Sequence, residues 1–295
     1  MAPSFSQELF DLIIDESASK GREEWPYLPK CDDCEGYGFR NDEDPIRTLL
    51  KSCSLVSKSW YSRASKHLWR GVTIIASHHS ALRSLRSVLT GNLELVTLVK
   101  HVALHAKLPL GENEASLQAL SCLLAPTTSF MLICHGRGWR HVFEAGSWNE
   151  DQPFIRTITP FCHADRLTSL FYDGRYFPTK LLAGIPNLRD FTLHSSHSSD
   201  PRIIHPLTFR LKRAHFSELS NAVYGTLIRG APQIFCQLEE LIFRETVGDD
   251  EWVDEDCSAQ IVLLAKDTVR QVYIGKSSPI TCKRLLCPSP WARLF

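Results

Sequence analysis

Apolar residues recur along most of the chain in six-residue blocks, with apolar side chains at the first, fourth and sixth positions. This spacing is typical of a turn that leads into a half-buried strand. From Leu167 onward, successive blocks start 21, 23, 27 and 31 residues apart. A slow repeat of this length indicates a protein built from stacked units. The clear blocks start at Val99, Leu167, Leu188, Leu211, Leu238 and Val269, and a weaker one starts at Thr128.

Short helices with one apolar side are expected between the blocks, over residues 178–184, 221–230 and 259–265. Neither a strand nor a helix of this kind can bury its apolar side alone, so neighbouring units must stack. The pattern therefore predicts a curved parallel sheet with helices on its outer side, over residues 77–295. Residues 135–165 break the spacing and are expected to form a long loop or an irregular unit.

The first part of the chain has a helical pattern. Residues 6–16 predict a short helix, and residues 48–70 predict a pair of helices. Residues 17–45 are rich in Gly, Pro and acidic residues, which predicts an insertion loop between them. Residues 1–76 are thus expected to form a helical module. Its shared stripe in residues 48–70 contains Leu49, Leu50, Cys53, Val56, Trp60 and Ala64.

Residues 55–69 resemble the second half of an F-box, because Leu55, Val56, Trp60, Ala64, Leu68 and Trp69 stand at its apolar positions. The first half is matched by Glu8, Leu9, Ile13 and Ile14, with Phe5 and Ser6 where Leu-Pro is usual. The blocks after residue 76 resemble the irregular leucine-rich repeats that commonly follow an F-box in fungal proteins. This resemblance implies a fold that is α+β overall, with a small all-helical F-box followed by a leucine-rich-repeat α/β solenoid.

The resemblance also implies a function without catalysis, as the substrate-recognition subunit of an SCF-type (cullin-RING) ubiquitin ligase in the cytoplasm or nucleus. The F-box would bind a Skp-family adaptor, and the repeats would bind the target protein. The implied adaptor-binding residues are Phe5, Leu9, Ile13, Leu50, Val56 and Trp60. The candidates for target binding, taken as outward positions of the strands, are Lys100, Arg189, Thr192, Lys212, His215, Glu239 and Arg270.

Composition and charge narrow the choice of partners. The chain has 33 basic and 33 acidic residues, so it lacks the charge excess expected of a protein that binds nucleic acid or a membrane surface. Its apolar runs are too short to span a membrane, and its first residues do not resemble a secretory signal. Most of the ten cysteines lie in apolar runs, which favours reduced, buried thiols.

The candidate chemistry is sparse. Cys31 and Cys34 form a Cys-x-x-Cys pair, half of a tetrahedral zinc site, which resembles one repeat of the DnaJ zinc module. A second pair with comparable spacing is missing, so two free thiols in a loop are favoured, and no metal or cofactor is expected. Motifs for hydrolases, nucleotide binding or metalloproteases are also missing. Two alternatives stay open: a leucine-rich-repeat scaffold not coupled to a ubiquitin ligase and, ranked last, a zinc-dependent protein.

Overall fold

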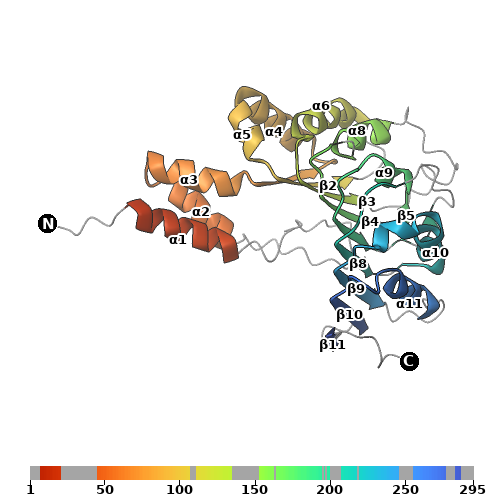
Figure 1. Ribbon diagram of the computed structural model, residues 1–295. Helices are drawn as coiled ribbons and strands as arrows, with labels where there is room; N and C mark the ends of the chain where they lie inside the picture. Colours follow the sequence, from red (N-terminus) through yellow and green to blue (C-terminus); the bar gives the residue numbers. More distant parts are fainter. Residues whose placement is uncertain are drawn as a thin grey trace.

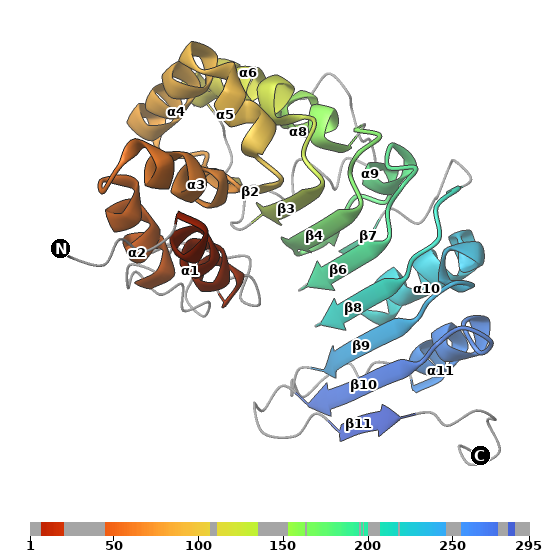
Figure 2. The ribbon, with the colours of Figure 1, turned by 60° about the vertical axis from the view of Figure 1, so that its left-hand side comes forward.

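The computed structural model describes residues 7–20, 45–106, 111–134, 153–162, 164–194, 196, 198–199, 207–217, 219–245, 255–276 and 283–286. Its architecture is mixed α/β, with a unit of three helices at one end and a parallel sheet covered by further helices (Figure 1). The predicted combination of a helical module and a parallel sheet with helices on one side is therefore present. The strands follow one another in a twisted arc (Figure 2).

The main sheet has nine strands, and each of the six clear blocks supplies one that begins two residues after the block does. The first eight strands are parallel, and the last is antiparallel to its neighbour. A separate pair consists of β5 (Tyr176–Phe177) and β7 (Ser198–Ser199). The strands of the main sheet are, in order, β1 (Gly71–Ile75), β2 (His101–Ala106), β3 (Ser129–Cys134), β4 (Ser169–Gly174), β6 (Asp190–His194), β8 (Arg213–Ser217), β9 (Glu240–Glu245), β10 (Gln271–Lys276) and β11 (Lys283–Leu286).

Helices between successive strands cover one face of this sheet. The three helices predicted over 178–184, 221–230 and 259–265 are confirmed as α9, α10 and α11, although α11 begins earlier than expected. Two short 3-10 helices, Gly111–Asn113 and Pro232–Phe235, lie in the connections. The helices are α4 (His79–Gly91), α5 (Leu93–Leu98), α6 (Glu114–Leu124), α8 (Pro153–Cys162), α9 (Lys180–Ala183), α10 (Asn221–Gly230) and α11 (Glu255–Leu264).

The main core lies between the sheet and these helices. Alternate strand residues are buried on this side, as Phe191 and Leu193 are in β6 and Ala214 and Phe216 in β8. The ring of Phe216 lies 6.1 Å from that of Phe191 and 6.0 Å from that of Phe243 in β9, measured between centroids. Because such contacts pass from strand to strand, the repeated units share one continuous core.

The N-terminal unit consists of α1 (Gln7–Lys20), α2 (Pro45–Ser54) and α3 (Lys58–Leu68). It has its own small core, separate from the main one. Helix α3 starts where the hydroxyl of Ser57 accepts a hydrogen bond from the backbone N–H of Trp60, a typical N-cap. Trp69 directly follows α3 and packs against the main core, so it joins the two parts. The small core contains Ile14, Ala18, Leu50, Cys53 and Ala64.

Two boundaries predicted from the sequence are wrong. The insertion predicted at 17–45 starts too early, because α1 continues to Lys20. The module boundary at residue 76 is too late, because β1 pairs with β2 and so belongs to the sheet. Of the two alternatives predicted for residues 135–165, a loop along the whole stretch is excluded, because the stretch contains α8, whose residues Ile155 and Ile158 are buried. Their helical spacing stabilises a helix even though Pro160 lies inside it; residues 135–152 and 163 lie outside the described residues.

Candidate functional site

Exposed apolar side chains concentrate on the three-helix unit. Of the eleven large apolar side chains that are exposed in the described part of the chain, seven belong to this unit. Leu55 is 87% exposed, Leu12 63% and Val56 62%. Exposed apolar groups of this kind are typical of interaction surfaces. We call these seven residues the apolar set: Leu9, Leu12, Ile13, Leu49, Leu55, Val56 and Tyr61.

Helix α1 shows how the sequence produces the apolar set. Ile14 and Ala18, four residues apart, face the small core and are buried. Leu9, Leu12 and Ile13 have the spacing i, i+3 and i+4, so they share a stripe on the opposite side and stay exposed. A helix with apolar stripes on two sides is typical of one that is covered on both. The small core covers the side of α1 that carries Ile14 and Ala18, while the side with Leu9, Leu12 and Ile13 stays exposed.

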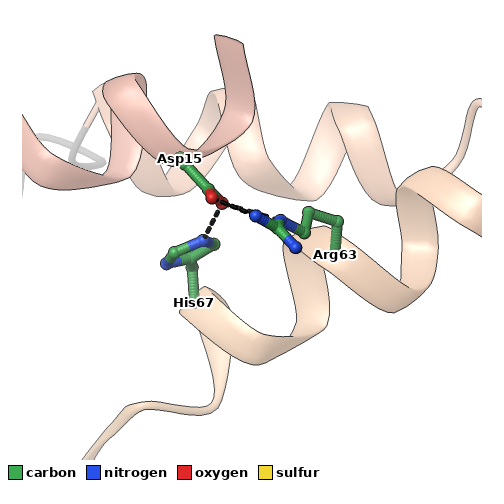
Figure 3. A network of polar contacts seen from close by, with 3 residues as sticks. All are labelled: Asp15, Arg63 and His67. Carbon is green, nitrogen blue, oxygen red and sulfur yellow. Dashed lines mark hydrogen bonds and ion pairs between the residues drawn. The ribbon is translucent and has the colours of Figure 1, made fainter. Parts of the chain in front are cut away.

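Helix α1 is also fixed by a polar contact to α3, which Figure 3 shows. Arg63 donates through Nε to Oδ1 of Asp15 at 2.8 Å and through Nη2 to Oδ2. Nε2 of His67 lies 2.8 Å from the same Oδ1. The hydrogen bonds from Arg63 and the contact with His67 lower the pKa of Asp15 to about 2, although partial burial opposes the shift. We call Asp15, Arg63 and His67 the clamp; it ties α1 to α3.

The residues predicted for adaptor binding fall into three groups. Leu9, Ile13 and Val56 are exposed, while Trp60 is half-buried and packs against the small core. Leu50 is only 5% exposed and lies inside that core. Its expected role as an exposed anchor is therefore corrected: it supports the unit from within. Phe5 lies outside the described residues.

Four members of the apolar set were not among the residues predicted for adaptor binding, although Leu49 and Leu55 were assigned to the helical module. One of them, Leu12, could have been found from its spacing to Leu9, because residues three apart lie on the same side of a helix. The exposure of the others depends on how the helices pack, which the sequence pattern does not reveal. These others are Leu49, Leu55 and Tyr61.

A second surface is the face of the main sheet opposite the helices. Pairing in register places the middle residues of neighbouring strands side by side on this face, so that Thr192 of β6 lies next to His215 of β8. Both were predicted as target-binding residues, and both are half-buried. Phe171 continues their row on one side, and Ile242 and Tyr273 on the other.

The other predicted target-binding residues form a row of their own at the amino ends of the strands. The backbone N–H of Lys212 donates to the carbonyl oxygen of Arg189 at 2.7 Å, and that of Glu239 to the carbonyl oxygen of Lys212 at 2.8 Å. The same backbone hydrogen bond joins the equivalent residues of the other neighbouring strands. The structure therefore places these residues side by side, one for each strand. We call this the amino-end row: Arg70, Lys100, Thr128, Thr168, Arg189, Lys212, Glu239 and Arg270.

The sheet carries polar and thiol groups of the kinds that take part in catalysis. Nδ1 of His194 lies 3.3 Å from Oδ1 of Asp173, which is almost fully buried. Ser217 is next to His194 in register. The thiol of Cys162 is buried, which raises its pKa and keeps it neutral. The contact between Asp173 and His194 thus links two neighbouring strands.

Neither a metal-binding cluster nor a membrane span is found where the chain is described. No group of three or more His, Cys, Asp or Glu residues there could hold a metal ion. Cys31 and Cys34, the candidate zinc ligands, lie outside this part. None of the helices in it is both long and apolar enough to cross a membrane. No known family model matches the sequence, and no curated protein is significantly similar to it.

Proposed function

We propose that this chain is the substrate-recognition subunit of an SCF-type (cullin-RING) ubiquitin ligase. In this proposal the three-helix unit acts as the F-box and binds a Skp-family adaptor. The sheet and its helices act as a leucine-rich-repeat-like solenoid that holds the target protein. The chain itself performs no chemistry, and its contribution is proximity, since holding a target near the ligase raises its effective concentration. It would act in the cytoplasm or nucleus.

The observation that supports this proposal most is the apolar set. Its residues are exposed although the described part of the chain also forms buried apolar clusters, among them the main core and the small core. A few apolar anchors provide most of the binding free energy in a typical protein interface. A row of apolar side chains with helical spacing on α1 also matches the way helices dock into apolar grooves.

The arrangement of the two parts also supports the proposal. The three-helix unit stands at the β1 end of the sheet and is joined to it through Trp69 (Figure 1). The helix-free face of β6 to β10 belongs to the other part of the chain. An adaptor bound to the three-helix unit and a target bound to the helix-free face of the sheet would therefore contact different residues. A receptor subunit must be able to bind both at once.

The experiment is capture of the purified chain by an immobilised Skp-family adaptor. We expect the wild-type chain to be captured and the Val56→Asp variant to be lost, because a carboxylate would have to be buried in the interface. Val88→Asp is the control, because Val88 is also exposed but lies on α4, outside the three-helix unit. Circular dichroism would show that both variants keep their fold.

Two outcomes would contradict the proposal. If the folded wild-type chain is not captured, the function as a ligase subunit is wrong, and the alternative of an interaction scaffold without a ligase takes its place. If Val56→Asp and Val88→Asp are captured equally well, the apolar set is not the adaptor-binding surface.

A further inference from the structure

Basic side chains outnumber acidic ones where the strands begin. The amino-end row and the first residues of β6, β8 and β9 contain six basic residues and three acidic ones. The chain as a whole is neutral, so this is a local excess. The basic residues are Arg70, Lys100, Arg189, Lys212, Arg213 and Arg270, and the acidic ones are Asp190, Glu239 and Glu240.

Two of the acidic residues are already neutralised by neighbours. Nζ of Lys212 lies 3.3 Å from Oε1 of Glu239. Arg213 donates two hydrogen bonds to Asp190, at 2.7 and 2.6 Å. Each of these two pairs has no net charge. The remaining charged residues are four basic ones and Glu240, so their net charge is positive.

Three of the cations are exposed and are not neutralised within the described part of the chain. The side chains of Lys100, Arg189 and Arg270 make no hydrogen bond or ion pair with any side chain described there. Along the amino-end row, Lys100 lies three strands from Arg189, and Arg189 lies three strands from Arg270. Neighbouring strands lie about 4.8 Å apart, so the three charges are spaced by roughly 14 Å.

We propose that this row binds an extended acidic segment of the target protein, an inference that rests on the proposed function as a receptor. An extended peptide advances about 3.3 Å per residue, so acidic residues about four positions apart would match the spacing of the three cations. The helix-free face beside the row offers half-buried Ile242 and Tyr273 for apolar residues of the same segment. The amino ends of the strands lie opposite the arrowheads in Figure 2.

A peptide fits this surface better than a nucleic acid does. Glu240 lies among the cations and would repel a phosphate. The two neutralised pairs, Lys212 with Glu239 and Arg213 with Asp190, offer no net charge to attract one, so a continuous line of phosphates is poorly matched. A peptide can place its carboxylates against the three free cations and uncharged residues against the neutralised pairs. Charge complementarity of this kind determines the specificity and rate of association.

The experiment measures fluorescence anisotropy of the full chain with a fluorescein-labelled peptide of alternating glutamate and serine. The same peptide with glutamine in place of glutamate is the matched probe. We expect the glutamate peptide to bind, to be released by salt, and to bind about tenfold more weakly to an Arg189→Ser, Arg270→Ser variant, since an exposed charge pair contributes up to about fivefold. Arg229→Ser removes an exposed cation from α10 instead and should change nothing.

The proposal is overturned if the double variant binds the glutamate peptide as tightly as the wild type does. It is also overturned if labelled single-stranded DNA binds more tightly than the peptide and is weakened by the same substitutions, because the row would then be a nucleic-acid contact. The adaptor is absent from this assay. Failure of adaptor capture with intact peptide binding would therefore refute the ligase function and leave the acidic-segment site standing.

Discussion

Replacing Asp15 by Asn should loosen α1 from the rest of the three-helix unit. Asn keeps the size of the side chain but removes the negative charge that receives two hydrogen bonds from Arg63 and the contact with His67. Among the α1 side chains that the structure describes, Ile14 and Ala18 are the ones buried in the small core. The clamp is therefore a large part of what holds this helix in place.

The magnitude follows from the pKa of Asp15, which falls from 3.8 to about 2 on folding. A fully shielded carboxylate with this shift would contribute about 2.5 kcal/mol. The Asp15 side chain is 36% exposed, so screening by solvent reduces the contribution to about 1 kcal/mol. Because the folded pKa is the lower one, this contribution is complete above pH 3.8 and is lost as the pH falls toward 2.

Hydrogen exchange of the α1 amides measures this effect. A loss of about 1 kcal/mol makes exchange through local opening about fivefold faster in Asp15→Asn at neutral pH. Glu8→Gln is the control, because Glu8 is an exposed acid in the first turn of the same helix. The effect of a charge there falls off within that turn, so the amides near Asp15 should exchange less than twofold faster in Glu8→Gln. If the two variants exchange at the same rate, the clamp does not hold α1.

Three further predictions concern the core, the junction and the thiols. Phe216→Ala should lower the free energy of unfolding by about 3–5 kcal/mol, because its ring is buried among other aromatic rings; a loss below about 1 kcal/mol in urea titration would contradict this. Trp69→Ala should speed hydrogen exchange in α3 more than in β9, since Trp69 joins the two parts; equal changes would argue against that role. In the native protein iodoacetamide should modify exposed Cys122 and spare Cys162, whose pKa is raised by burial; peptide mapping showing equal modification would refute it.

The repeated strands could be predicted because their signal is local. The block starting at Leu188 places Phe191 and Leu193 in the core, and the structure has β6 there. Helix α8 could not be predicted in the same way, since it lies in a stretch without the block spacing and contains Pro160. It forms because Ile155 and Ile158 find a place in the core, which depends on the surrounding fold.

The candidate surfaces were predicted only in part. Apolar spacing marked both Leu50 and Ile13 as members of a helical stripe, but it could not show that one faces the small core and the other faces outward. That difference depends on how α1 packs against α2 and α3, which lie much later in the sequence. The clamp joins α1 to residues 48 and 52 positions later in the chain, so no local pattern could reveal it.

The central claim is that the apolar set of the three-helix unit binds a Skp-family adaptor. The most direct test is calorimetric titration of the adaptor into Leu12→Asp and Leu93→Asp, two variants of leucines that are each 63% exposed. Leu93 lies on α5, outside the three-helix unit. We predict that Leu12→Asp weakens binding at least tenfold and that Leu93→Asp binds like the wild type. Equal affinities for the two variants, or a folded wild-type chain that does not bind, would contradict the claim.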